Sequence, residues 1–419
     1  MLYNGPAARH LRGSVAMTGT ASIAPPRVLG LVADDFTGAA DCAVGFAEHG
    51  WRVELALRSD APPKLNPSIA TVLALTTEAR ALPDADAAQQ TFAAAKELIT
   101  AGAERLYIKI DSTVRGSVAA QMDGAIRAWS TAHDNAVAVV CPAFPDLGRT
   151  VVDGVVLVDG VPVGDTAAGI DPVTPRTESN LLRIIPGSVR GTLDTVCSAR
   201  LVVVDARTTS DLDMLAAKLA WADNSVIIVG SGGLSAALGR LWPVEPASPR
   251  TWLPRRETSD VLVVVSSLHP VTRQQVAQLR EQPSDQVKIL TATQAVKISA
   301  ADAAAELADR ASAELTTGRY LAAVLVGGDG AAAILRRLAA DRVVVDSMIN
   351  TGCPAGTVVG GRADGLRLIT KSGGFGKPDT LIRIVDRLRS DAGTRTGRPP
   401  NLGRLPDLSP KPPLQEEAP

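Results

Sequence analysis

The sequence predicts an α/β protein of two domains, each with a mainly parallel, Rossmann-like sheet flanked by helices, and an active site in the cleft between them. Short runs rich in Val, Leu and Ile alternate with helix-compatible stretches. The runs lack strict apolar–polar alternation, which indicates strands buried on both faces. A proline-rich stretch at 241–259 divides the chain, and 419 residues suit roughly two to three domains.

The first domain is predicted over 27–240. Its strands are expected at 28–33, 52–57, 71–75, 106–110, 136–141, 201–205 and 225–230. Its helices are expected between them, at 39–49, 85–100 and 211–221. The rhythm changes within 155–163, where the Asp159-Gly160 pair between two short β-like runs is typical of a hairpin.

The second domain is predicted over 260–390, after an interdomain linker at 241–259. Its strands are expected at 261–265, 287–290, 322–326, 342–345 and 366–370, and its helices at 300–315 and 379–388. The ends of the chain lack this rhythm and are rich in Pro and Gly, so 1–26 and 391–419 are predicted to be flexible tails. Met17 offers a second candidate start.

Composition excludes some classes of function. A formal net charge of −1, without a basic face, argues against nucleic acid as a partner. The four cysteines lie far apart and form no CxxC or Cys/His cluster, so buried free thiols are expected rather than zinc ligands or disulfides. No apolar run approaches the roughly 18 residues of a membrane span. The composition indicates a cytoplasmic enzyme with no membrane partner.

The most informative segment is 33–38 (ADDFTG), where an apolar strand ends in two carboxylates before a helix. Ligands of open α/β sheets bind beyond the carboxyl ends of strands. Adjacent Asp34 and Asp35 should repel, which would raise the pKa of one and let it accept a proton. The alternative is that one of them only caps the helix. A phosphatase motif would alternate as Asp-x-Asp, and this pair does not.

A second polar junction follows the strand near residue 108, in the segment KIDSTVRG. Lys109 and Asp111 share a face because strand side chains repeat every second residue. Ser112 can donate a hydrogen bond, and Arg115 offers a planar fork for a carboxylate or phosphate. A ligand with hydroxyls and an acid group would suit this set. The alternative is a structural Asp–Arg pair that stabilises the turn.

A third junction, Pro142–Gly154, begins with a proline bend, and Arg149 within it could reach the same crevice. A plain proline-rich turn explains this segment equally well.

The second domain has two glycine turns after apolar strands. In 326–333 (VGGDGAAA) the glycines stand at the start of a helix, where backbone amides and the helix dipole can bind phosphate oxygens. This turn is neither a Walker A loop nor a GxGxxG fingerprint. In 371–376 (KSGGFG) Lys371 adds a positive charge near the expected triphosphate. Ser266 and Ser267 mark a third junction, and His269 there is interpreted as a loop residue.

Five segments together resemble the four-carbon acid-sugar kinase family. They occur in the family's order and spacing, and the resemblance covers about 28–388: ADDFTGAAD at 33–41, KIDSTVRG at 109–116, CPAFPDLGRTVVDG at 141–154, VGGDGAAA at 326–333 and KSGGFG at 371–376. The resemblance implies an N-terminal domain that binds the sugar acid and a C-terminal domain that binds ATP. The implied reaction phosphorylates the terminal hydroxyl of threonate, erythronate or 3-oxo-tetronate.

The resemblance also implies roles for individual residues. Asp35 would orient or deprotonate the hydroxyl. The sugar acid would be bound by Asp34, Lys109, Asp111, Ser112, Arg115 and Arg149. ATP would be bound by Ser267, Gly327, Gly328, Asp329, Gly330, Gly373 and Gly374. Mg²⁺ is expected on the phosphates, with no dedicated protein cage and no predicted metal ligand, and closure of the domains would exclude water.

Two positions depart from the family pattern, which usually has Gly at 266 and often Thr at 330. Here Ser266 is expected to tighten its turn, and Gly330 lacks a hydroxyl, so both should affect the ATP site. Three alternatives remain open: a dehydrogenase, a phosphatase and a non-catalytic sugar-acid sensor. The resemblance leaves the particular acid and a homo-oligomeric state open.

Overall fold

The computed structural model describes residues 24–57, 65–66, 68–171, 173–195, 197–246, 258–282, 284–292 and 300–393. The predicted tails fall outside these ranges, apart from 24–26 and 391–393. The last three of these residues belong to helix α10. Of the predicted linker, 247–257 also lies outside the described residues.

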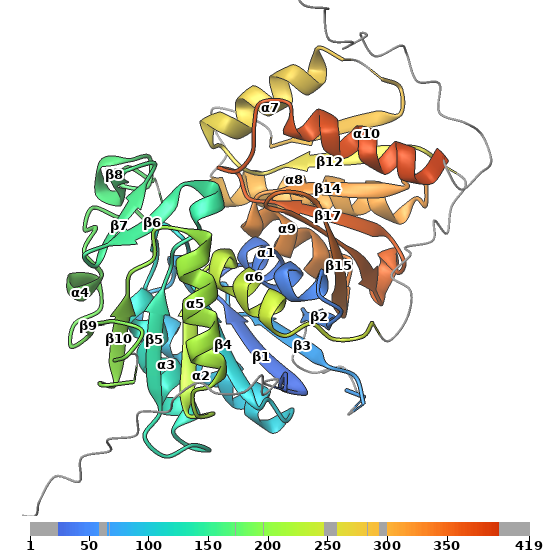
Figure 1. Cartoon of the computed structure of the whole chain (residues 1–419). Coiled ribbons are helices and arrows are strands. Elements are labelled where there is room, and N and C mark those ends of the chain that lie inside the picture. Colours follow the sequence, from blue (N-terminus) through green and yellow to red (C-terminus); the bar gives the residue numbers. More distant parts are fainter. Residues whose placement is uncertain are drawn as a thin grey trace, which may run out of the picture.

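Among the described residues, fourteen strands form one sheet in the order β13-β12-β14-β17-β16-β15-β2-β3-β1-β4-β11-β5-β10-β9 (Figure 1). In chain order they are β1 (Val28–Ala33), β2 (Arg52–Ala56), β3 (Thr71–Thr76), β4 (Arg105–Lys109), β5 (Val137–Cys141), β9 (Val189–Gly191), β10 (Leu201–Val204), β11 (Val226–Gly230), β12 (Val261–Val265), β13 (Val287–Thr291), β14 (Ala322–Val326), β15 (Arg342–Asn350), β16 (Cys353–Val359) and β17 (Arg367–Lys371).

The predicted parallel sheets are both present. Strands β2 to β9 in that order pair in parallel, and so do β13, β12, β14 and β17. Between them lies an antiparallel hairpin, β15–β16, which was not among the predicted elements. The predicted strand 342–345 is only its first part. Pro354 and Gly356 make β16 hard to predict from the sequence, because both residue types are depleted in strands.

The hairpin joins the two sheets into one, because β15 pairs antiparallel with β2. Val345 of β15 lies opposite Val53 of β2. Buried Glu54 forms an ion pair with Arg342 across this junction, with 2.7 Å between Oε2 and Nε. One apolar core includes residues of both halves, such as Leu31 and Leu325.

Helices cover both faces of the sheet (Figure 1). In the first half, α1 (Phe36–Ala47), α5 (Thr209–Ala220) and α6 (Gly232–Leu241) pack together on one face. On the other face α2 (Asp84–Thr100) packs against α3 (Val118–Trp129). In the second half, α8 (Ala300–Thr316) packs against α9 (Gly328–Arg337), and α7 (Pro270–Arg280) against α10 (Thr380–Gly393). Helix α9 also packs against α1, so the halves meet through helices as well.

A small antiparallel sheet stands apart from the large one, with β6 (Arg149–Val152), β7 (Val155–Val158) and β8 (Val161–Pro162). The predicted hairpin at Asp159-Gly160 is confirmed, with φ of 50° and 82° at these two residues. Asp153-Gly154 makes a second such turn, with φ of 53° and 77°. These positive values fit the type I′ turns that Asp-Gly pairs favour.

The cysteines and the length of the apolar helices bear on two expectations from composition. Cys42, Cys141 and Cys353 are buried free thiols as predicted, whereas the same prediction is wrong for Cys197, which is exposed on the surface. None of the helices in the described ranges combines the length and the apolar character that crossing a membrane requires.

Candidate active site

Strand register brings the polar junctions of the first half to one edge of the sheet. Ala33 at the end of β1 lies opposite Thr76 of β3 on one side and Lys109 of β4 on the other. Lys109 in turn lies opposite Gly230 of β11. Because these strands are parallel and end together, the residues that follow them lie side by side.

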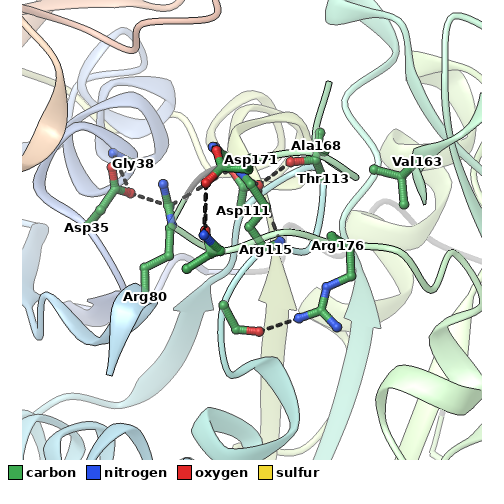
Figure 2. A network of polar contacts seen from close by, with 12 residues as sticks. Asp35, Gly38, Arg80, Asp111, Thr113, Arg115, Val163, Ala168, Asp171 and Arg176 are labelled. Carbon is green, nitrogen blue, oxygen red and sulfur yellow. Dashed lines mark hydrogen bonds and ion pairs between the residues drawn. The ribbon is translucent and has the colours of Figure 1, made fainter. Parts of the chain in front are cut away.

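Arg80, a residue outside all of the predicted motifs, connects the carboxylates at this edge. It lies in the short 3₁₀ turn after β3. Its guanidinium donates to both oxygens of Asp34, at 2.9 and 2.7 Å, and to Oδ1 of Asp35, at 2.6 Å. Oδ1 of Asp111 lies 3.9 Å away (Figure 2). This positive charge, on a side chain that is 19% exposed, therefore relieves the repulsion expected between the adjacent aspartates.

Asp35 caps helix α1, as one alternative had suggested. Its Oδ1 accepts from the amide of Gly38 at 3.1 Å, and its Oδ2 accepts from the hydroxyl of Thr37 at 2.6 Å. Burial acts to raise the pKa of Asp35, but Arg80, Lys109 and the Thr37 hydroxyl outweigh it and hold the pKa below its usual value. The expectation of a raised pKa is wrong for Asp35. An ionised carboxylate of this kind is better suited to orienting a hydroxyl than to holding its proton.

The turn after β4 builds the next part of the site (Figure 2). Asp111 and Ser112 are buried. Arg115 donates through Nε and Nη2 to Asp111, at 2.8 and 3.1 Å, and Thr113 donates to the same carboxylate. Burial opposes ionisation, but Arg115 and Arg80 hold the pKa of Asp111 well below its usual value. The structural Asp–Arg pair that was an alternative therefore exists, and it uses most of the Arg115 fork.

The second half repeats this arrangement at its own sheet edge. Val265, Val326 and Lys371 end three neighbouring strands in register. A Cβ on Gly373 would lie 2.0 Å from the Ser267 hydroxyl, so these two turns touch. Lys371 itself is fully buried, and its ammonium donates to the carbonyl of Ser372 at 2.8 Å. Burial lowers the pKa of Lys371 to about 8.

The two sides of the site face each other directly. A Cβ on Gly328, in the first turn of α9, would lie 2.8 Å from Oδ2 of Asp35. The glycine thus lets the positive N-terminal end of α9 approach the carboxylate. The guanidinium of Arg149 lies over the ring of Phe375, 5.6 Å from its centre, and so connects the first half to the KSGGFG turn.

His269 has a defined place, although it was interpreted as a plain loop residue. It caps α7, because its Nδ1 accepts from the amide of Val271 at 3.2 Å. Burial lowers its pKa, and the charges of Arg115 and Lys371 lower it further against the opposing charge of Asp171. Its ring packs against Gly374, with Nε2 3.4 Å from where a Cβ would stand. The Nδ1 contact leaves Nε2 as the protonated nitrogen of the neutral ring.

Two further carboxyls beside Asp35 were not predicted. Asp41 on α1 is buried, and its Oδ1 has no hydrogen-bond partner among the described residues. Burial raises the pKa of Asp41 to about 6, against the opposing effect of Lys109. Glu78 follows β3 with a φ of 50°. Burial, together with the charges of Asp35 and Asp329, raises the pKa of Glu78 to about 7.

Glu78 should make stability depend on pH. The folded protein holds the Glu78 proton more tightly than the unfolded chain, whose pKa is near 4.5, so the free energy of unfolding should fall as pH rises from there to about 7. Glu78→Gln removes the charge, so at pH 8 it should be more stable than the parent by about 2 kcal/mol, with no gain at pH 4. Urea unfolding at both pH values measures this. Glu281→Gln, at an exposed site, is the control, and the same pH dependence in both variants would contradict the assignment.

The two departures from the family pattern occupy the same space. The Ser266 hydroxyl donates to the carbonyl of Val326 at 3.0 Å. A Cβ on Gly330 would lie 2.3 Å from that hydroxyl oxygen and 2.4 Å from the Cβ of Ser266. A side chain at one position therefore excludes a side chain at the other.

This exclusion predicts strong coupling between the two positions. Gly330→Thr alone should weaken ATP binding about tenfold or more, because overpacking displaces the turn. Adding Ser266→Gly should restore most of the affinity, which isothermal titration calorimetry would measure as a double-mutant cycle. Additive effects of the two substitutions would show that the side chains do not compete.

The structure places the predicted residues in two groups that face each other. On the acceptor side these are Asp34, Asp35, Lys109, Asp111, Ser112, Arg115 and Arg149. On the glycine-turn side they are Ser267, Gly327, Gly328, Asp329, Gly330, Gly373 and Gly374. Arg80, Asp41 and Glu78 were missed, although Arg80 and Glu78 follow a predicted strand and could have been found by treating its end like the others. No group of three His, Cys, Asp or Glu side chains is placed to hold a metal ion within the described ranges.

A separate surface pocket of about 560 Å³ lies beside the edge strand β9. It is lined by residues such as Arg190, Thr192 and Met214, and it shares no lining residue with the polar site. Its location therefore adds nothing to the chemistry of the strand ends.

Comparisons with known proteins agree with the two-sided site. Residues 29–197 match a family model described as a sugar-binding N-terminal domain, and 303–381 match one described as a nucleotide-binding C-terminal domain. The fold resembles a solved Haemophilus influenzae protein of the DUF1537 family, with a TM-score of 0.64, 21% identity, and coverage of 85% of this chain and 98% of that one.

Curated relatives give the family. The chain is 35% identical to a D-threonate kinase of Bordetella bronchiseptica, over 88% of this chain and 99% of the relative. It is 27% identical to a 3-oxo-tetronate kinase of Burkholderia multivorans, again over 88% and 99%. The fold is that of a two-sided α/β protein whose halves match models of a sugar-binding and a nucleotide-binding domain. The chain belongs to the four-carbon acid-sugar kinase family.

Proposed function

We propose that this protein transfers the γ-phosphoryl group of ATP to the terminal hydroxyl of a four-carbon sugar acid. The observation that carries the proposal is the close approach of Gly328 to the carboxylate of Asp35. It sets the start of α9, a favourable place for phosphate, against a carboxylate that can accept a hydrogen bond from an alcohol. The named activities of the family's curated members support the same reaction.

On the acceptor side, the ionised carboxylate of Asp35 orients the attacking hydroxyl. Phosphoryl transfer depends mainly on positioning and on charge stabilisation, so a carboxylate with a lowered pKa is sufficient for this role. Arg80 donates a hydrogen bond to that carboxylate, and the charges of Arg80 and Lys109 keep it ionised. Arg149 and Arg115, with Asp34, Asp111 and Ser112, bind the acid and its hydroxyls.

On the donor side, backbone amides of the Gly327–Gly330 and Gly373–Gly374 turns bind the triphosphate, with Ser267 between them. His269 lies beside this turn in its neutral form, and its Nε2–H is the group that can donate a hydrogen bond to the triphosphate. The start of α9 adds its dipole, which favours the negative charge of phosphate.

The residues present fit a Mg²⁺ ion carried by the nucleotide. Magnesium bound to phosphates needs only one or two protein carboxylates. Asp329 in the first turn of α9 and Glu78, whose Oε1 has no hydrogen-bond partner among the described residues, would hold it. The ion would neutralise charge on the phosphates when bound.

Release of ADP tests the proposal. Purified protein with ATP and Mg²⁺ should form ADP upon addition of D-threonate, D-erythronate or a 3-oxo-tetronate, and product analysis should place the phosphate on the terminal oxygen. A sugar-acid sensor would bind one of these acids without forming ADP. A phosphatase would release phosphate from a phosphoester without ATP, and a dehydrogenase would require NAD(P). Any of these three results would replace the kinase assignment.

A further inference from the structure

A polar loop reaches into the acceptor side of the site, and neither the motifs nor the proposed roles include it. It is called here the Asp171 loop (168–176, with residue 172 outside the described part). The amide of Arg176 donates to the carbonyl of Ala168 at 2.8 Å and closes the base of the loop. Ile170 and Val173 are exposed, so the tip projects away from the apolar core.

Two side chains tie this loop to the turn after β4 (Figure 2). The carboxylate of Asp171 accepts from Nη1 of Arg115, with 2.9 Å between Oδ2 and the nitrogen. Arg176 donates through Nη2 to the carbonyl of Gly116. Asp171 is oriented for its contact, because its Oδ1 accepts from the amides of Val173 and Thr174 at 3.0 and 2.9 Å.

The two carboxylates on Arg115 differ in how firmly they are held. Asp111 is buried and also lies near Arg80 and Thr113. The Asp171 side chain keeps one-fifth of its surface exposed (20%) and comes from a loop rather than from a strand end. Asp171 is therefore the partner that can leave, while Asp111 stays.

Two further arginines near the turn that holds Arg115 keep an unused hydrogen-bond donor. Arg149 and Arg176 each have a buried Nε that lacks a hydrogen-bond partner within the described residues. Burial lowers the pKa of both, against the opposing charges of Asp159 and Asp111 on Arg149, and of Asp111, Asp84 and Glu178 on Arg176. A buried guanidinium nitrogen without a partner is costly, so a second anion placed here would be favourable.

A carboxylate is the group shared by Asp171 and by every four-carbon sugar acid. We propose that Asp171 occupies, in the ligand-free protein, the place on Arg115 that the substrate carboxylate takes, and that substrate binding releases the Asp171 loop. This inference rests on the proposed function. It makes Asp171 a specificity-determining residue, because a neutral polyol of the same length could not displace it from a charged partner.

Calorimetry on an isosteric pair of variants tests the displacement. Asp171→Asn removes the competing charge, so D-threonate should bind about three- to tenfold more tightly, since less of the site is blocked beforehand. Asp165→Asn, at an exposed site in the preceding turn, should bind as the parent does. Weaker or unchanged binding in the Asp171 variant would overturn the proposal, because it would make Asp171 a ligand contact or a bystander.

Hydrogen exchange on the unaltered protein gives a second measurement that does not depend on how a variant folds. Saturating D-threonate should accelerate amide exchange within 168–176, while erythritol, a neutral four-carbon polyol, should leave it unchanged. Slower exchange with D-threonate would mean that the loop closes on the ligand, and the proposal would be wrong. ADP formation without loop release would overturn only this inference. Loop release without ADP formation would overturn only the kinase function.

Discussion

Turnover should fall by about 10²- to 10⁴-fold when Asp35 is replaced by asparagine, while ATP binding stays within about threefold of the parent. The amide keeps the shape of the side chain and one oxygen for the Gly38 amide. It loses the charge, and its NH₂ group, in the place of Oδ2, would face the hydroxyl of Thr37. The hydroxyl of the acceptor would then lack an ionised partner. Steady-state kinetics with a coupled ADP assay give kcat, and calorimetry gives the ATP affinity.

The separation of the two measurements is what identifies the role of Asp35. Equal loss of turnover and of ATP affinity would indicate that the variant disturbs the start of α9 instead of the acceptor. Full turnover would exclude Asp35 from the reaction. Asp86→Asn, at an exposed position in the first turn of α2, serves as the control for a charge change remote from the site.

Loss of the Arg80 guanidinium should have the largest effect on stability, about 3–5 kcal/mol for Arg80→Met. Methionine keeps the apolar stem but leaves Asp34 and Asp35 without their shared donor, and Asp111 loses a nearby cation. The lowered pKa values of Asp35 and Asp111 contribute stability that is present above the unfolded value of 3.8 and is lost as pH falls through the folded values. The difference between parent and variant should therefore shrink below about pH 4.

Urea unfolding at pH 7 and pH 3.5 measures both parts of this prediction. Arg240→Met is the matched control, because Arg240 forms an exposed ion pair with Asp213 and should lose at most about 1 kcal/mol. A loss as small as this in the Arg80 variant would show that the buried carboxylates find other partners. A constant loss across pH would show that the effect comes from packing.

The parallel strands were predictable because apolar runs of Val, Leu and Ile carry their own signal. The antiparallel hairpin was not, since Pro354 and Gly356 contradict strand propensity and pairing on both sides overrides it. The edge-to-edge joining of the two sheets depends on the pairing of β2 with β15, almost 300 positions apart in the chain. No local pattern encodes such a pairing.

The residues of the site also include some that the sequence could predict and some that it could not. Asp35, Asp111 and Arg115 were accessible to prediction because they directly follow predicted strands. The prediction of a raised pKa is wrong for Asp35 because it left out Arg80, whose charge arrives from another strand end. The exclusion of a side chain at 330 by Ser266 also depends on tertiary contact, although both departures were visible in the sequence.

The ladder between β2 and β15 limits how the two halves of the molecule can move. A hinge that swung one half away from the other would have to break the pairing of Arg342–Val345 with Val53–Ala56 and expose the Glu54 carboxylate. Breaking this pairing would cost much free energy. Substrates are therefore expected to enter through a small change of sheet twist distributed over many strands and through local loop motions. The molecule would then behave as one stiff body in which only loops open and close.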